Sequence, residues 1–169
     1  MPRLVHLSAR FFSSLRRDEP SEVDLAWAHT ALTAAEWKCW CALGPADRRE
    51  AIRTAHRTAA ALADTPHAGD VRYVGAALCH DVGKASARLG PVRRALATTL
   101  GAVWAPERVP GRAGQYLRHP AVGAALLEEA GARPEVVAWA GAHHDPSNWP
   151  PGIPREVCEA LARADGEDV

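Results

Sequence analysis

The sequence has very little lysine and no surplus of charge of either sign. Lys38 and Lys84 are the only lysines among the 20 basic residues of this 169-residue chain, and 20 acidic residues balance them. No long block of one sign occurs, so the composition predicts neither nucleic-acid nor membrane binding. We therefore expect a small-molecule partner. The preference for arginine and alanine is typical of a GC-rich bacterial genome.

Long apolar runs and a cysteine framework are also missing. No apolar stretch reaches the roughly 20 residues that a membrane-spanning helix needs, so a cytoplasmic protein is the simplest interpretation. The four cysteines, at positions 39, 41, 79 and 158, show no regular spacing, as is usual for reduced thiols. The length predicts one core and leaves the oligomeric state open.

The alternation of apolar and polar residues that marks β-strands does not appear, whereas helix signals are frequent. Thr33 and Glu36 have the spacing of a capping box, and Pro120 and Pro134 each suit a first helical turn. Helices are expected over residues 47–64, 92–103 and 119–131, with others ending near His80, His143 and Asp165. The sequence thus predicts an all-α bundle over residues 46–169, preceded by a small N-terminal helical annex, residues 1–45.

The most informative stretch is an apolar run that ends in His80 and Asp81. Because residues 74–78 should be buried, a lone carboxylate at this helix end would be costly unless it is paired or binds a metal ion. Gly83 can end the helix, and Lys84 falls on the same side of the turn as Asp81. The dipeptide alone allows two interpretations, a buried His–Asp hydrogen bond or a pair of metal ligands.

Further histidines and carboxylates stand at predicted helix ends. They are His119, His143, His144 and Asp165. A bundle can bring such ends together, and imidazole with carboxylate ligands suits Fe, Mn, Zn, Co or Ni. The set therefore predicts a site for a divalent transition metal, and two ions are plausible.

These motifs resemble the HD superfamily of metal-dependent phosphohydrolases over about residues 46–168. The core motif of that superfamily is similar to His80-Asp81-Val82-Gly83-Lys84. The HD-GYP branch has segments similar to His119-Pro120-Ala121-Val122-Gly123 and His143-His144, and Asp165 matches the closing aspartate. The loop after His144 lacks the Gly-Tyr-Pro motif, so the cyclic-dinucleotide activity of that branch is not implied.

The resemblance implies two metal ions that share Asp81. One would be bound by His80, Asp81, Asp165 and an upstream residue, and the other by Asp81, His119, His143 and His144. At the upstream position Glu50 replaces the histidine of the family, and His56 is the alternative ligand. Since six residues separate them, they face different directions on a helix, and both remain candidates.

The implied function is hydrolysis of a phosphodiester or phosphomonoester, on a nucleotide or a similar phosphorylated small molecule. Asp81 would bridge the metal ions, and Lys84 would stabilise the charge that develops on the phosphate. Two alternatives stay open. One is an HD-type diiron oxygenase, and the other is a non-catalytic sensor that binds a nucleotide or a metal.

Overall fold

The computed structural model describes residues 19–87, 89–90, 96–100 and 104–166, and these residues contain helices but no strand. In chain order the helices are α2 (Glu22–Ala31), α3 (Ala34–Cys41), α4 (Pro45–Ala61), α5 (Val71–Cys79), α6 (Lys84–Ala87), α8 (Gly111–Leu117), α9 (His119–Ala130), α10 (Pro134–Ala142) and α11 (Arg155–Asp165). Short 3₁₀ turns, η1 (Pro106–Arg108) and η2 (Pro146–Asn148), lie in the connections. The predicted all-α, HD-type bundle is confirmed.

Local sequence signals account for several helix ends. The Thr33 side chain accepts a hydrogen bond from the Glu36 backbone N–H, and the Glu36 carboxylate accepts one from the Thr33 N–H. This reciprocal pair satisfies two backbone donors that α3 leaves without partners. Gly131 ends α9 with a φ of 79°, a left-handed conformation that favours glycine.

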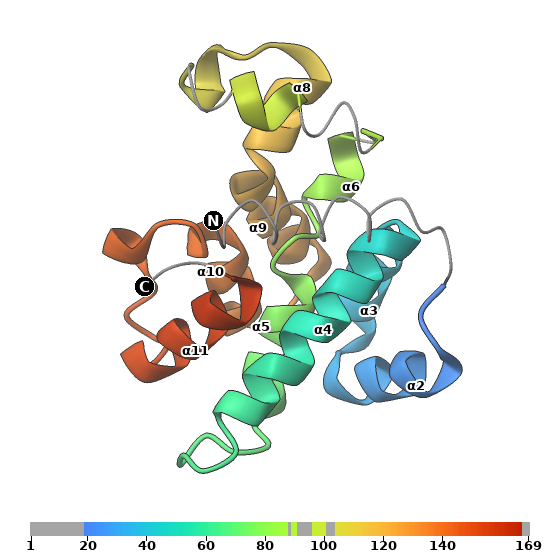
Figure 1. Ribbon diagram of the computed structural model, residues 1–169, viewed down its shortest axis with the longest axis vertical. Coiled ribbons are helices and arrows are strands. Elements are labelled where there is room, and N and C mark those ends of the chain that lie inside the picture. The colour runs from blue at the N-terminus through green and yellow to red at the C-terminus, as the bar shows by residue number, and fades with distance from the viewer. Residues whose placement is uncertain (1–18, 88, 91–95, 101–103, 167–169) are drawn as a thin grey trace, which may run out of the picture.

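Helix α5 lies at the centre of the bundle (Figure 1), where α4, α10, α2, α3 and α11 contact it. Every residue from Tyr73 to Cys79 is buried. A helix that is apolar on all sides must be enclosed in this way, since no face can be left to water. Because His80 and Asp81 follow Cys79 directly, they lie at the end of this enclosed central helix.

Helices α2 and α3 pack against this bundle. Ala28, Ala31, Trp40 and Leu43 belong to the same buried cluster as the residues of α5. The proposed boundary near residue 45 thus lies within a shared core and stays a prediction. Of the helix predicted over residues 92–103, the structure describes residues 96–100, which are helical, and the rest lies outside the described residues.

Within the described part of the chain, no helix combines the length and the apolar character needed to cross a membrane.

Candidate metal centre

Four helix ends bring the candidate ligands together. His80 is the C-cap of α5 and Asp81 follows it, His119 begins α9, and His143 is the C-cap of α10. Asp165 is the last residue of α11. His80, Asp81, His119 and His143 are all buried. The bundle therefore places four ionisable side chains in an interior that normally excludes them.

Three of the histidines share one orienting contact. Nδ1 lies 2.7 Å from the Ala77 carbonyl oxygen in His80, 2.8 Å from that of Tyr116 in His119, and 3.0 Å from that of Ala140 in His143. Each carbonyl belongs to the residue three positions earlier and can only accept, so each Nδ1 carries the hydrogen. In the neutral tautomer this leaves the Nε2 lone pair available to a metal ion.

The Asp81 carboxylate lies among these rings. Its Oδ1 is 3.1 Å from Nε2 of His119 and 3.9 Å from Nε2 of His143. Its Oδ2 is 3.4 Å from Nε2 of His80, which is also 3.4 Å from Oδ1 of Asp165. Asp81 thus contacts His80 through one carboxylate oxygen and His119 and His143 through the other.

His119, His143 and His144 form the most compact group. One nitrogen of each lies within 4.8 Å of the nitrogens of the other two. The rings of His143 and His144 have centroids 4.0 Å apart, and those of His119 and His144 are 5.2 Å apart. His144 is exposed, unlike the other two, so this group reaches from the interior to solvent.

The electrostatics of the centre favour a positive charge. Burial alone disfavours the imidazolium of His80, but Asp81 and Asp165 outweigh burial and raise the pKa of His80 well above its ordinary value. Burial also acts against ionised Asp81, yet Lys84, His80 and His119 hold the pKa of Asp81 well below its usual range. Carboxylates that stay ionised in a buried site stabilise a nearby cation.

The other two buried histidines stay neutral. Burial lowers the pKa of His119 despite its contact with Asp81. Burial, reinforced by His80 and His144, holds the pKa of His143 well below its ordinary value. Neutral imidazole is the form of histidine that binds metal ions.

These residues fit a divalent transition metal. Nε2 of His80, His119 and His143 and Oδ1 of Asp81 are buried, and none has a hydrogen-bond partner within the described structure. Four buried polar atoms without partners would be costly, whereas a cation that replaced the proton of His80 would satisfy all four together. His119, His143 and His144 with Asp81 could bind one ion, and His80, Asp81 and Asp165 could contribute to a second.

Gly83 holds two of these segments together. A Cβ atom at this position would overlap the carbonyl oxygen of His119 and lie 2.7 Å from the backbone nitrogen of Gly123. The turn after Asp81 can therefore contact the first turn of α9 only because residue 83 has no side chain. This contact brings Asp81 close to His119.

Lys84 contacts Oδ2 of Asp81 with its ammonium group. Burial lowers the pKa of Lys84, but Asp81 outweighs burial and raises it above the ordinary value of 10.5. The ammonium also lies 6.0 Å from the centre of the Tyr116 ring. Lys84 is therefore charged at neutral pH and stands beside the candidate ligands.

The two upstream candidates engage other partners. Glu50 forms ion pairs with Arg53 and Arg57. His56 stacks on Trp27, with ring centroids 3.9 Å apart, and its Nε2 lies 3.4 Å from Oδ1 of Asp24. Neither belongs to the metal-ligating group found among the described residues. The prediction that one of them reaches a metal ion has no support from this arrangement and stays a prediction.

Sequence reasoning missed Tyr116. Its carbonyl oxygen orients His119, and its ring lies near Lys84. The available signal was its position three residues before a histidine at a helix start, the separation at which Ala77 and Ala140 also contact their histidines.

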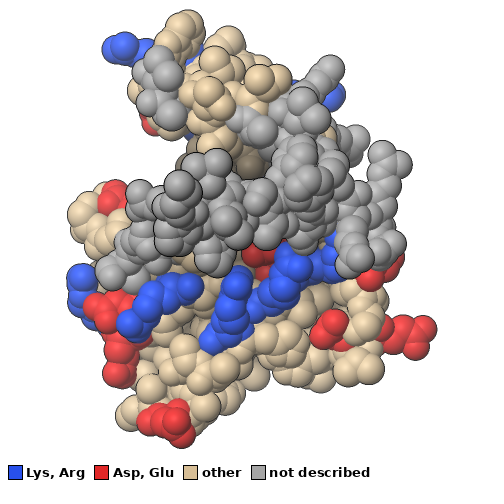
Figure 2. Space-filling model, viewed as in Figure 1, with Lys and Arg blue, Asp and Glu red and all other residues tan. Residues whose placement is uncertain are grey.

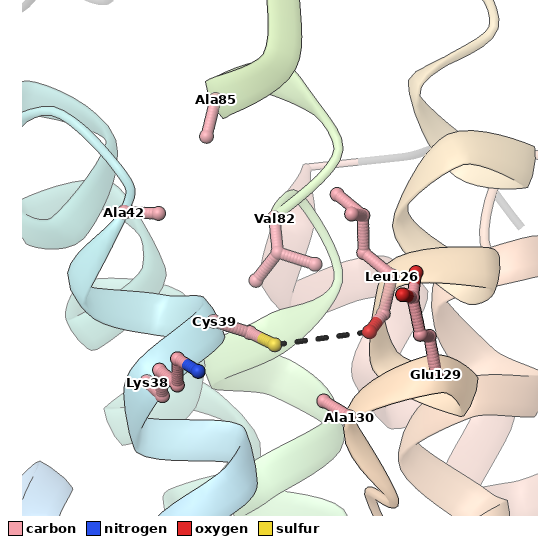
Figure 3. Close-up of a pocket in the computed structure, with 8 residues that line it drawn as sticks. All are labelled: Lys38, Cys39, Ala42, Val82, Ala85, Leu126, Glu129 and Ala130. Carbon is pink, nitrogen blue, oxygen red and sulfur yellow. Dashed lines mark hydrogen bonds between the residues drawn. The ribbon is translucent and has the colours of Figure 1, made fainter.

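A cavity of about 330 Å³ lies next to the same turn (Figure 3). Val82 forms part of its wall, and Cys39 and Leu126 face each other across it, with Cys39 Sγ 3.9 Å from the Leu126 carbonyl oxygen. Its remaining lining residues are Lys38, Ala42, Ala85, Glu129 and Ala130. None of the candidate ligands lines it, so this mostly apolar cavity is separate from the candidate metal centre.

Comparison with known proteins agrees with this geometry. A family model described as "Cas3, HD domain" matches residues 15–160. No curated protein and no solved structure matches the chain significantly. The resemblance to the HD superfamily is confirmed, while the finer likeness to the HD-GYP branch stays a prediction.

Proposed function

The chain belongs to the Cas3 HD-domain family, and we propose that it is a metal-dependent nuclease that hydrolyses the phosphodiester bonds of a nucleic-acid strand. HD domains are generally metal-dependent hydrolases, and the Cas3 HD domain is a nuclease. The observation that carries the proposal is the set of buried Nε2 atoms of His80, His119 and His143 around the Asp81 carboxylate. Such a donor set suits the metal ions on which phosphodiester hydrolysis depends.

A bound divalent metal would supply Lewis acidity, which polarises a phosphoryl oxygen and makes water a better nucleophile near neutral pH. The chain's own residues prepare the centre for this chemistry. The Ala77, Tyr116 and Ala140 carbonyls hold the rings of His80, His119 and His143 so that each Nε2 faces inward. Hydrogen bonds of this kind, from the ring nitrogen that does not bind the metal, fix the tautomer and the direction of a ligand.

Asp81 and Lys84 would have different roles in the reaction. Asp81 contacts both sets of imidazoles and would serve as a shared ligand. Lys84 places a permanent positive charge against Oδ2 of Asp81, where a bound phosphate would gather negative charge as the bond breaks. A fixed ammonium in a largely buried site stabilises such charge more strongly than one in water.

The balanced charge of the whole chain favours a second candidate, hydrolysis of a nucleotide or another small phosphorylated molecule. A small substrate needs only the few cations at the centre, whereas a strand also contacts the surrounding surface. The two candidates share the ligands and the reaction and differ in the size of the substrate. They are separated by which phosphate esters the protein cleaves.

The test is hydrolysis of three substrates by the purified protein supplied with Mn, Fe, Co, Ni or Zn. These are bis(4-nitrophenyl) phosphate, a single-stranded oligonucleotide and a set of nucleoside phosphates. We expect cleavage of the first two, and loss of both metal and cleavage in Asp81→Asn and His143→Ala. His67→Ala is the matched control, because His67 contacts Glu156 away from the centre.

Three results would contradict the proposal. Cleavage of nucleoside phosphates alone would favour the small-molecule hydrolase. Iron-loaded protein that consumes O₂ with an organic substrate and cleaves no phosphate ester would indicate an oxygenase. Tight nucleotide binding by fully metal-loaded protein without turnover would indicate a sensor.

A further inference from the structure

Helix α4 carries a regular row of arginines. Arg49, Arg53 and Arg57 follow one another at intervals of four residues. Four residues advance a helix by about 6 Å and slightly more than one full turn, so these side chains form one ridge. Figure 2 shows basic side chains in a row across the face of the molecule that α4 occupies in Figure 1.

The ridge is locally rich in positive charge, and two of its three side chains are exposed, whereas Arg49 is half-buried and its Nη1 is buried. The side chains of Arg53 and Arg57 are 48% and 54% exposed, and both pair with the single carboxylate of Glu50. A guanidinium has five N–H donors, so one that contacts a carboxylate can also donate to phosphate oxygens. The net charge of zero is a sum over the whole chain, so it does not show this local excess of positive charge.

The ridge also lies beside the candidate metal centre. Helix α4 packs on α5 and α11, whose ends carry His80 and Asp165. Because α4 and α5 are consecutive and run in opposite directions (Figure 1), the first half of α4 lies next to the end of α5. Ala51 and Thr54 are buried on the inner side of α4, which leaves the arginines on the outer side.

We propose that the ridge formed by Arg49, Arg53 and Arg57 binds the backbone phosphates of the nucleic-acid strand and leads it to the metal centre. This proposal rests on the proposed nuclease function and adds the surface that holds the polymer. Regularly spaced guanidinium groups suit a ligand whose negative charges are also regularly spaced, and a mononucleotide would reach only one of them. Such contacts read the backbone rather than the base sequence.

The test measures binding of a fluorescently labelled single-stranded oligonucleotide by anisotropy, with EDTA present to prevent hydrolysis. Affinity is followed as the salt concentration rises. Each phosphate contact to a single strand contributes about 0.7 to the slope of log K against log salt. The double variant Arg53→Gln/Arg57→Gln should bind more weakly, with a slope lower by about 1.4.

Two further variants make the result specific. Arg72→Gln is the matched control, since Arg72 is 46% exposed and also ion-paired, but lies at the opposite end of α5. Its slope should equal that of the parent. Arg53→Lys/Arg57→Lys keeps both charges and should restore most of the slope, which excludes misfolding as the cause of the loss.

The outcomes separate this proposal from the nuclease function itself. Equal slopes for the parent and the double glutamine variant would contradict the proposal that the ridge binds the strand, even if the parent cleaves oligonucleotides. A reduction of the slope in Arg72→Gln as large as that in the double variant would contradict it too. A parent that cleaves no phosphodiester with any of the metals would instead contradict the nuclease function, whatever the binding experiment shows.

Discussion

Arg133 and Glu36 form a bidentate ion pair between α3 and α10. Nε of Arg133 lies 2.8 Å from Oε1 of Glu36, and Nη2 lies 2.6 Å from Oε2. The backbone N–H of Arg133 donates to the same carboxylate at 3.0 Å. Glu36 is completely buried, and Gly75 of α5 leaves space for the guanidinium. The pair thus joins the N-terminal helices to the centre of the bundle.

We predict that Glu36→Ala will lower the free energy of unfolding by about 3 kcal/mol, because it leaves the Arg133 guanidinium partly buried without its carboxylate. Urea denaturation followed by circular dichroism measures this change. Glu159→Ala is the control, since its pair with Arg155 is exposed and should be worth less than about 1 kcal/mol. Equal losses of stability in the two variants would show that the buried pair stabilises the fold no more than the exposed pair does.

The same pair predicts a dependence of stability on pH. Burial raises the pKa of Glu36, but hydrogen bonds from Arg133 and Thr33 outweigh it and lower the pKa below its ordinary value of 4.5. Near and below that pH the unfolded chain binds more protons at this position than the folded chain, so the stabilisation is complete above it. It is lost as the pH falls through the lower, folded-state pKa.

The stability difference between the parent and Glu36→Gln should therefore be constant from pH 7 to about 5 and shrink in more acidic solution. Thermal melting at a series of pH values measures it. A difference that stays the same down to pH 3 would mean that Glu36 is not responsible for the acid sensitivity.

The sequence predicted the grouping of the candidate ligands better than it predicted the contacts that surround them. The His80–Asp81 pair and His119 stand at helix ends, and helix ends can be predicted from capping residues and apolar periodicity. The structure brings these residues together as a bundle requires. Pairing between Glu36 and Arg133 had no comparable signal, because 97 residues separate them and both residue types are common on surfaces.

Helix periodicity was also insufficient for α4. It could show that Glu50 and His56 face different directions, but it could not show what either side chain contacts. Trp27, from a different helix, supplies the partner of His56, and two arginines of α4 itself supply those of Glu50. Choices among neighbouring surface partners depend on tertiary packing, which one sequence does not specify.

Gly83 offers a prediction about the centre's geometry. Gly83→Ala should force the turn away from α9, because the new methyl group meets backbone atoms of His119 and Gly123 that cannot rotate aside. We expect a loss of stability of about 1–3 kcal/mol or more and a lower metal content, since Asp81 and His119 would separate. Elemental analysis and thermal melting measure both effects.

Gly131→Ala is the control for Gly83→Ala. Gly131 has a left-handed backbone conformation that alanine adopts only with strain, but a Cβ atom there meets nothing within 4 Å. The substitution should therefore reduce stability without reducing metal content. Retention of metal in Gly83→Ala at the level of the parent would show that this close contact does not position the ligands.

The last prediction concerns the only two lysines of the chain. Lys84 contacts Asp81 and stays charged because that carboxylate raises its pKa, so it cannot act as a base at neutral pH and can contribute only through its charge. If it stabilises the transition state, Lys84→Met should keep metal content and lower kcat about 10²-fold, the order expected for one electrostatic donor. Lys38→Met, which removes an exposed ammonium beside the separate cavity, should leave kcat unchanged. Unchanged turnover in metal-loaded Lys84→Met would remove Lys84 from the mechanism, and a joint loss of metal and stability would assign it to the structure of the centre instead.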